Sequence, residues 1–149
     1  MNNKKILNLV IGAMIAAIYA AATYLSSVFG IAYGPIQFRF SEALTVLSVF
    51  SPAAIPGLTV GCIIGNLASP FGIWDIVFGS LATLIGALGA YALRHRSVYF
   101  APIPTILANT FIIPAVICGM MGEWSLLLYV SSAATIFLGE VLSCGVIGL

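Results

Sequence analysis

Charged residues are scarce in this sequence. They make up 6% of its 149 residues, whereas a soluble domain carries about 25%. Because 62% of the residues are hydrophobic, the chain has too few polar groups to cover a globular surface in water, and we expect a membrane protein. Its five basic and four acidic residues nearly balance, so the chain has no basic surface that could bind nucleic acid by releasing counterions.

Residues that hold metals or perform catalysis are also few. The three cysteines fall in separate apolar segments without CxxC spacing, and the single histidine, His95, has no second histidine or cysteine near it in the sequence. This pattern predicts no metal site and no bound cofactor. No glycine-rich phosphate loop is present, so we expect that the chain cannot hydrolyse ATP by itself. An intramembrane enzyme would have to rely on Glu42 and Asp75 alone, and we predict a protein that is not an enzyme.

What the sequence does contain is long apolar runs, which turn residues divide into six segments. The segments are 6–29, 41–51, 52–68, 73–93, 100–120 and 125–148. A membrane-spanning helix needs about 20 residues, so the second and third segments together are too long for one upright span and too short for two full ones. Ser51 followed by Pro52 is typical of a helix start. We therefore expect a break there, which produces either two crossings or a re-entrant pair.

The basic residues provide an independent test of this break. Lys4 and Lys5 precede the first segment, and Arg94 and Arg96 lie between the fourth and the fifth. Basic residues favour the cytoplasmic side, and both pairs can be cytoplasmic only if an even number of crossings separates them. The sequence therefore predicts an all-α, polytopic membrane protein: a single membrane-embedded domain over 1–149, built as a six-helix transmembrane bundle with both termini cytoplasmic.

Most of the remaining charges gather at the outer side of this topology. A charged side chain near mid-membrane costs roughly 2.5–3.5 kcal/mol on insertion scales, so it usually has a partner or faces an aqueous cavity. Arg39 and Glu42 are three residues apart, and we expect an ion pair between them, either at the mouth of a site or self-contained at the surface. Asp75 either joins this pair or caps the next helix. Glu140 lies deeper and needs a partner of its own.

Aromatic rings and amides accompany these charges, as in a site for a flat polar ligand. Phe38 and Phe40 alternate with polar residues, and the stretch GNLASPFGIWD brings an amide, an indole and a carboxylate to the same level. The candidate ligand-binding residues are Gln37, Phe38, Arg39, Phe40, Glu42, Asn66, Trp74 and Asp75. Together they favour a small-molecule site that opens outward.

Small residues characterise the first apolar segment. Ala13, Ala17 and Ala21 recur every four residues, and Ala16 and Ala20 form a second row beside them. Small residues at this spacing let another helix approach closely in a membrane. Because the alanines cover more than half a turn, the two rows can serve two different contacts.

Two longer stretches resemble a known family. IQFRFSEALTVL at 36–47 and AIPGLTVGCIIGNLASPFGIWDIVFGSLATLIGA at 54–87 are similar to the queuosine-precursor transporter (QueT) family, whose members are substrate-binding S-components of energy-coupling-factor importers. The resemblance implies six helices in the plasma membrane of a prokaryote, and a ligand site near the outer face that the loop between the first two helices closes. It also implies that Ala13, Ala17 and Ala21 dock against a transmembrane coupling subunit driven by two ATPase subunits.

The ligand that the resemblance implies is a deazaguanine base such as queuine or its aminomethyl precursor. Such a base offers a ring N–H and an exocyclic amine to a carboxylate, and a carbonyl to Asn, Gln or Arg. We expect Glu42 to bind the guanine-like edge and Asp75 to act as a second acid, with Arg39 orienting one of them, or the two acids exchanged. The alternatives are an S-component for another small planar vitamin and a non-catalytic membrane scaffold. The resemblance also implies a polar cytoplasmic tail, so we expect the natural chain to continue beyond residue 149.

Overall fold

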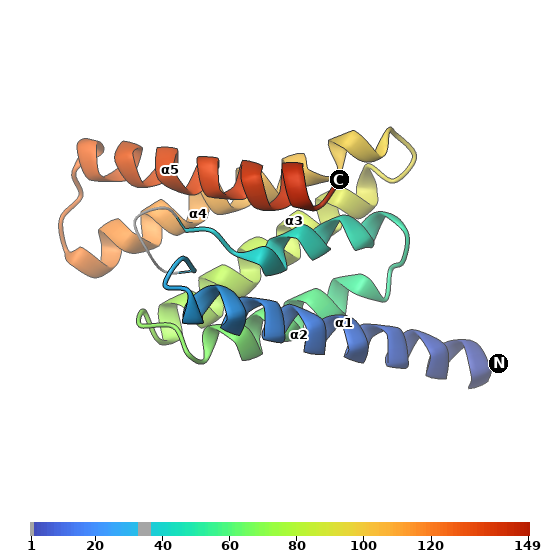
Figure 1. The fold of residues 1–149 in the computed structure, drawn as a ribbon. Coiled ribbons are helices and arrows are strands. Elements are labelled where there is room, and N and C mark those ends of the chain that lie inside the picture. The colour runs from blue at the N-terminus through green and yellow to red at the C-terminus, as the bar shows by residue number, and fades with distance from the viewer. Residues whose placement is uncertain (1, 33–36) are drawn as a thin grey trace.

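The computed structural model describes residues 2–32 and 37–149 as helices that run back and forth along one direction (Figure 1). The elements are α1 (Asn2–Val28), η1 (Phe40–Val49), α2 (Ala54–Asn66), η2 (Asp75–Gly79), α3 (Ser80–Ala92), η3 (Val98–Phe100), α4 (Pro102–Met121), α5 (Leu126–Glu140) and η4 (Val141–Ile147). Because η2 runs directly into α3, η3 leads into α4 and η4 continues α5, these residues form six helices, and no β-strand occurs among them. The predicted all-α fold with six helices is confirmed.

Four of the described helices are long and apolar enough to cross a membrane. They cover Asn3–Val28, Asp75–Ala92, Val98–Met121 and Leu126–Ile147. The ten residues of η1, a 3-10 helix, rise about 20 Å. The 13 residues of α2 also rise about 20 Å, against a hydrocarbon core of about 30 Å. The chain turns between these two short helices at 50–53, so the break predicted from Ser51 and Pro52 is confirmed.

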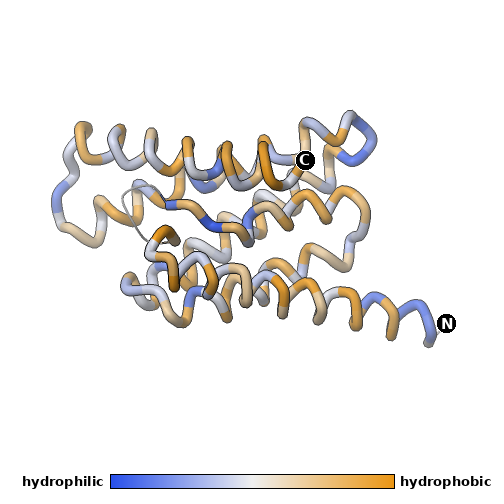
Figure 2. Tube along the Cα trace, in the orientation of Figure 1, coloured by the Kyte–Doolittle hydropathy of each residue, from blue (hydrophilic) through white to orange (hydrophobic). Residues whose placement is uncertain are grey.

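Both chain termini lie at the same end of the bundle (Figure 1). The turn between η1 and α2 and the loop after α3 also lie there, while the loops after α2 and after α4 lie at the opposite end. Figure 2 shows hydrophilic residues at the N-terminus and in the loop after α3, the segments that contain Lys4, Lys5, Arg94 and Arg96. The two basic segments therefore share one end, as an even number of crossings requires, and their cytoplasmic location stays a prediction.

Small residues bring α1 and α2 close together. A Cβ atom added at Gly61 would lie 2.8 Å from the carbonyl oxygen of Ala16, so only glycine fits this position without a shift. Ala16 and Ala20 are buried and form the row that faces the bundle. The other row, exposed on the outer surface of α1, consists of Ala13, Ala17 and Ala21. The two alanine rows thus have different surroundings, and one of them remains free for a further contact.

The bundle is apolar on the outside, and its interior contains polar side chains beside an apolar core. Large hydrophobic side chains such as Leu9 and Leu126 are 74% and 80% exposed, an arrangement that suits lipid rather than water. In the interior, by contrast, Glu42, Asn66 and Thr83 are each no more than 1% exposed. The helices therefore enclose a polar centre, and the candidate site lies in it.

Candidate functional site

Four of the nine charged residues lie in the interior. Arg39, Glu42, Asp75 and Glu140 are 6%, 1%, 4% and 5% exposed, respectively, whereas Lys4, Lys5, Arg94, Arg96 and Glu123 are exposed. Since each buried charge in a membrane protein needs a partner or a polar cavity, the surroundings of these four side chains define the candidate site.

Arg39 binds two other predicted residues. Its Nη2 donates to Asp75 Oδ2 at 2.9 Å, and its Nη1 donates to Asn66 Oδ1 at 3.3 Å. Asn66 in turn donates from Nδ2 to the Asp75 backbone carbonyl at 2.9 Å. Burial disfavours the charged guanidinium, but the combined attraction of Asp75 and of the other groups around it, among them Glu42, outweighs this effect and raises the pKa of Arg39 above its usual range. The structure thus joins the segment before η1, the end of α2 and the start of η2 through one cation.

The prediction of an ion pair between Arg39 and Glu42 is wrong. Among the described residues, Arg39 forms its salt bridge with Asp75. The prediction assumed that both residues lie on one helix. Arg39 instead has an extended backbone, with φ −119° and ψ 113°, and η1 begins one residue later. Its side chain therefore reaches Asp75, while Glu42 enters the interior from η1.

Glu42 is the centre of a second polar cluster. Tyr19 donates a hydrogen bond from its hydroxyl group to Glu42 Oε1, and Thr83 Oγ1 donates to the same oxygen at 3.4 Å. Cys62 Sγ, 3.3 Å from Thr83 Oγ1, is the alternative acceptor for the same hydroxyl hydrogen. The second carboxylate oxygen of Glu42, Oε2, has no hydrogen-bond partner among the described residues although it is buried. One carboxylate oxygen of Glu42 is therefore hydrogen-bonded by its neighbours, and the other can still accept a hydrogen bond.

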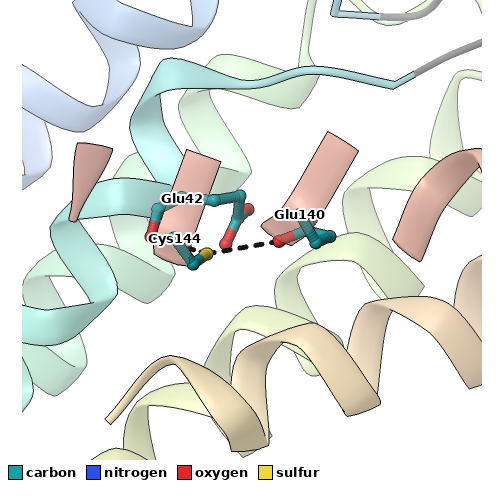
Figure 3. Close-up of side chains that lie close together, drawn as sticks. All are labelled: Glu42, Glu140 and Cys144. Carbon is teal, nitrogen blue, oxygen red and sulfur yellow. Dashed lines mark hydrogen bonds between the residues drawn. The ribbon is translucent and has the colours of Figure 1, made fainter. Parts of the chain in front are cut away.

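Glu140 and Cys144 complete this cluster from the last helix, as Figure 3 shows. Cys144 Sγ lies 3.3 Å from both Glu140 Oε2 and the Glu42 backbone carbonyl, and its single S–H can donate to either one. One oxygen of each carboxylate and the thiol sulfur all lie within 4.8 Å of one another. Asn109 of α4 lies beside both carboxylates with its amide placed to donate to them, although its Nδ2 forms no hydrogen bond of good geometry with the described residues.

Two carboxylates and a thiol are ligand types that a divalent metal ion accepts. In this arrangement, however, the neighbours of Cys144 Sγ are two acceptor oxygens, which suit a thiol that donates to one of them, whereas a metal ion is bound by the thiolate. The geometry therefore favours a ligand that donates hydrogen bonds to Glu42 and Glu140.

The predicted residues before η1 lie against the last helix. The backbone carbonyl of Gln37 faces Gly139, where an added Cβ would collide with its oxygen. The Phe38 and Phe40 rings pack edge to face, with centroids 5.0 Å apart, and both are half-buried. This segment thus covers the polar interior next to Glu140.

Trp74 lies away from the polar interior. Its side chain is 51% exposed, and its ring stacks on Phe78 with centroids 5.8 Å apart. It lines an apolar groove of about 510 Å³ together with residues of α4, among them Phe111, and with Trp124. The structure therefore does not bring Trp74 to the other predicted site residues, although Trp74 directly precedes Asp75 in the sequence.

Five interior residues were not among the predicted site residues. They are Tyr19, Thr83, Asn109, Glu140 and Cys144. Of these, Glu140 gave a signal, because it is the only charged residue in its apolar segment. Tyr19 and Thr83 are ordinary residues of their helices, and only the packing of the bundle places them beside Glu42.

Comparison with known proteins gives the family. The chain matches the sequence profile of the QueT transporter family over residues 9–149. It is 39% identical over 85 residues to the queuosine precursor transporter QueT of Lactococcus lactis subsp. cremoris, a match that covers 57% of this chain and 50% of that protein. The chain thus spans about half the length of this curated relative, and no solved structure matches it. A transporter family implies a role other than catalysis. The chain belongs to the QueT transporter family and is a multi-pass membrane protein.

Proposed function

We propose that this chain is the substrate-binding subunit of an energy-coupling-factor importer for a queuosine precursor, a deazaguanine base such as queuine or its aminomethyl precursor. The observation that carries the proposal is the buried Glu42 carboxylate, of which Oε2 has no partner among the described residues. The printed name of the Lactococcus relative supports the substrate class.

The free groups of the interior match the polar groups of such a base. Glu42 Oε2 can accept a hydrogen bond from a ligand N–H group, while Tyr19 holds the other oxygen. The Asn109 amide, which lies beside both carboxylates, can donate to the ring carbonyl once the ligand takes its place next to them. Asp75 is already bound by Arg39 and Asn66, so in this proposal it fixes the segment before η1 rather than binding the ligand itself.

The aromatic residues of that segment remain candidates for stacking on the base. Phe38 lies between Gln37 and Arg39, and Phe40 directly follows Arg39, so the contacts of Gln37 and Arg39 fix the position of both rings. Three apolar grooves of the described surface are lined by neither Glu42 nor Glu140.

The exposed alanine row of α1 supports the coupling part of the proposal. Ala13, Ala17 and Ala21 face outward, and such a row lets a partner helix approach closely. The sequence has no phosphate-binding loop, so the energy for import has to come from other subunits. We infer that this row docks against a transmembrane coupling subunit driven by two ATPase subunits, in the plasma membrane of a prokaryote.

Calorimetric titration of the detergent-purified protein tests the ligand. We expect saturable binding of an aminomethyl deazaguanine or queuine and none of riboflavin or guanine. Glu42→Gln should weaken binding about 10- to 100-fold, since a hydrogen bond to a charged group contributes roughly 1.5–3 kcal/mol. The matched control is Glu123→Gln, because Glu123 is exposed and should not affect binding.

The possible negative results separate the alternatives. Unchanged affinity in a folded Glu42→Gln variant would remove Glu42 from the site. Binding of riboflavin in place of any deazaguanine would favour an S-component for another planar vitamin. A folded protein that binds a membrane partner but no small molecule would be a scaffold. Co-purification with one larger membrane subunit and two ATPases is the result expected for the importer.

A further inference from the structure

The groove beside Trp74 has no part in the candidate site of the interior. It lies between η2 and α3 on one side and α4 on the other, and its volume is about 510 Å³. No described residue of its lining carries a charge or a hydroxyl, amide or thiol group. Because both tryptophans of the chain, Trp74 and Trp124, line it, we call it the tryptophan groove.

The local sequence gives the groove a small floor and aromatic walls. Ala115 and Gly119 lie one helical turn apart on α4 and leave the floor open. Gly122 ends α4 with φ 67°, a conformation that suits glycine, and the chain then returns so that Trp124 Cζ2 lies 4.0 Å from where a Cβ atom of Gly119 would be. The ring of Trp74, stacked on Phe78, forms part of the opposite side.

The dimensions of the groove fit a hydrocarbon chain. Its lining residues on α4 run from Phe111 to Gly119, which is about 12 Å of helix. The volume of about 510 Å³ over this length gives a cross-section of about 40 Å², against about 80 Å² for a helix 10 Å in diameter. A partner helix is therefore too wide, whereas a single acyl chain can enter. A polar ligand would lose its hydrogen bonds to water here without replacing them.

The surface around the groove faces the bilayer. Both segments that form its walls belong to candidate membrane spans, Asp75–Ala92 and Val98–Met121. The loops after α2 and after α4, next to Trp74 and around Trp124, lie at the end opposite the two basic segments (Figure 1). Tryptophan is enriched at the level of the lipid headgroups. The tryptophan groove is thus continuous with the lipid-exposed surface of the protein and begins near the headgroups of one leaflet.

A single acidic side chain lies next to the groove at this end. Glu123 directly precedes Trp124, is exposed, and forms no salt bridge with any residue that the structure describes. The exposed basic residues of the described chain all lie at the other end of the bundle. The groove opening therefore carries a negative charge, which attracts a headgroup with an ammonium group and repels an anionic one.

We propose that the tryptophan groove binds one acyl chain of a membrane phospholipid whose headgroup carries a primary ammonium group, and that this ammonium pairs with the Glu123 carboxylate. The surrounding lipid is as apolar as the groove, so burial of the chain gives no preference for one lipid over another. The headgroup therefore decides which lipid occupies the groove. The inference is independent of the proposed function, because none of these residues lies in the polar interior.

Tryptophan fluorescence tests the inference, since both tryptophans of the chain line the groove and bromine atoms on an acyl chain quench an indole on contact. The full chain is reconstituted into vesicles with equal amounts of phosphatidylethanolamine and phosphatidylglycerol that have matched chains. Only the first lipid is brominated in one preparation, and only the second in the other. We expect stronger quenching by brominated phosphatidylethanolamine, corresponding to a preference of about 2- to 5-fold.

Two variants assign this preference to the groove and to Glu123. Glu123→Gln should make quenching by the two lipids equal. Gly119→Leu fills the floor beneath Trp124 and should also reduce the difference, and because Gly119 is exposed the variant should fold. The matched control is Ala17→Leu, at an exposed position of α1 away from the groove, which should retain the full preference.

Several results would overturn the inference. Equal quenching by both lipids in the unmodified protein would mean that only unselective surrounding lipid touches the groove. Weak quenching by both would mean that a second copy of the chain covers it. A full preference in Glu123→Gln would exclude the pairing with the headgroup. If Gly119→Leu fails to fold in thermal unfolding, the comparison of the unmodified protein with Glu123→Gln still decides the question.

Discussion

Replacing Asp75 by leucine should destabilise the protein strongly, because it leaves the Arg39 cation buried without its salt-bridge partner. Arg39 is 6% exposed, and its Nη2 lies 2.9 Å from Asp75 Oδ2. Removal of one partner of a buried ion pair costs about 3–5 kcal/mol, mainly through the charge that remains. We expect a loss of this size in Asp75→Leu, and a similar loss in Arg39→Met, which leaves the carboxylate and the Asn66 amide oxygen without their donor.

The double variant Arg39→Met/Asp75→Leu separates the ion pair from the packing around it. With both charges gone, the remaining loss includes that of the donors to Asn66 Oδ1 and to the Ala32 carbonyl, about 2–6 kcal/mol for the two acceptors. Additive single losses would instead amount to about 6–10 kcal/mol. The coupling between the two residues should therefore be several kcal/mol.

Equilibrium unfolding in mixed micelles, with SDS as denaturant and circular dichroism as readout, measures these free energies. Arg94→Met is the matched control: this arginine is exposed and contacts the neighbouring Tyr91 ring and carbonyl, so its loss should stay within about 0.5 kcal/mol. A loss below about 1 kcal/mol in folded Asp75→Leu, or additive losses in the double variant, would refute the reasoning, since both imply that water already solvates the pair.

Other substitutions and reagents test the packing of the bundle. Gly139→Ala should lower stability by about 1–3 kcal/mol, because the new Cβ collides with the Gln37 carbonyl oxygen. Gly119→Ala, whose Cβ would have its nearest neighbour 4.0 Å away, should leave stability unchanged or raise it by up to about 1 kcal/mol. Equal melting temperatures of the two variants in thermal unfolding would contradict the close contact at Gly139. Ala17→Trp should leave unfolding unchanged but prevent co-purification with the coupling subunit. Ala16→Trp should destabilise the isolated protein, because Ala16 packs against α2. If Ala17→Trp still co-purified with the coupling subunit, the exposed alanine row would not be the docking face. The three cysteines are buried and should react with a maleimide only after unfolding, so rapid labelling of the folded protein would contradict their placement.

The parts of the site that could be predicted were those that contrast with their surroundings. Arg39, Asn66 and Asp75 stand out because a charge or an amide in an apolar run costs free energy unless it has a partner, and the structure brings these three together. Which of these charged residues pair with each other was harder to predict from the sequence. Spacing along a helix suggested Glu42 as the partner of Arg39, but the chain is extended at Arg39, and spacing rules for helices do not apply there.

The neighbour of a site residue in sequence is not its neighbour in space. Trp74 precedes Asp75, yet successive residues of a helix point about 100° apart, so Asp75 is buried and Trp74 is 51% exposed on an apolar groove. Conversely, Glu42 and Cys144 are 102 residues apart and share a hydrogen bond. Such a contact depends on how two helices are rotated against each other. Hydrophobic patterning specifies this rotation only weakly here, because almost every face of these helices is apolar.

The sequence by itself determined the class of the protein, its six helices and the common end of its two basic segments. These properties follow from composition, from the lengths of apolar runs and from local turn residues, which act without any long-range contact. Only the tertiary structure decided which alanine row is buried, which acid binds Arg39, and that Glu140 meets Glu42 in the interior. The reason is that each of these outcomes requires side chains from separate helices to face one another, and that arrangement arises from the close packing of the whole bundle.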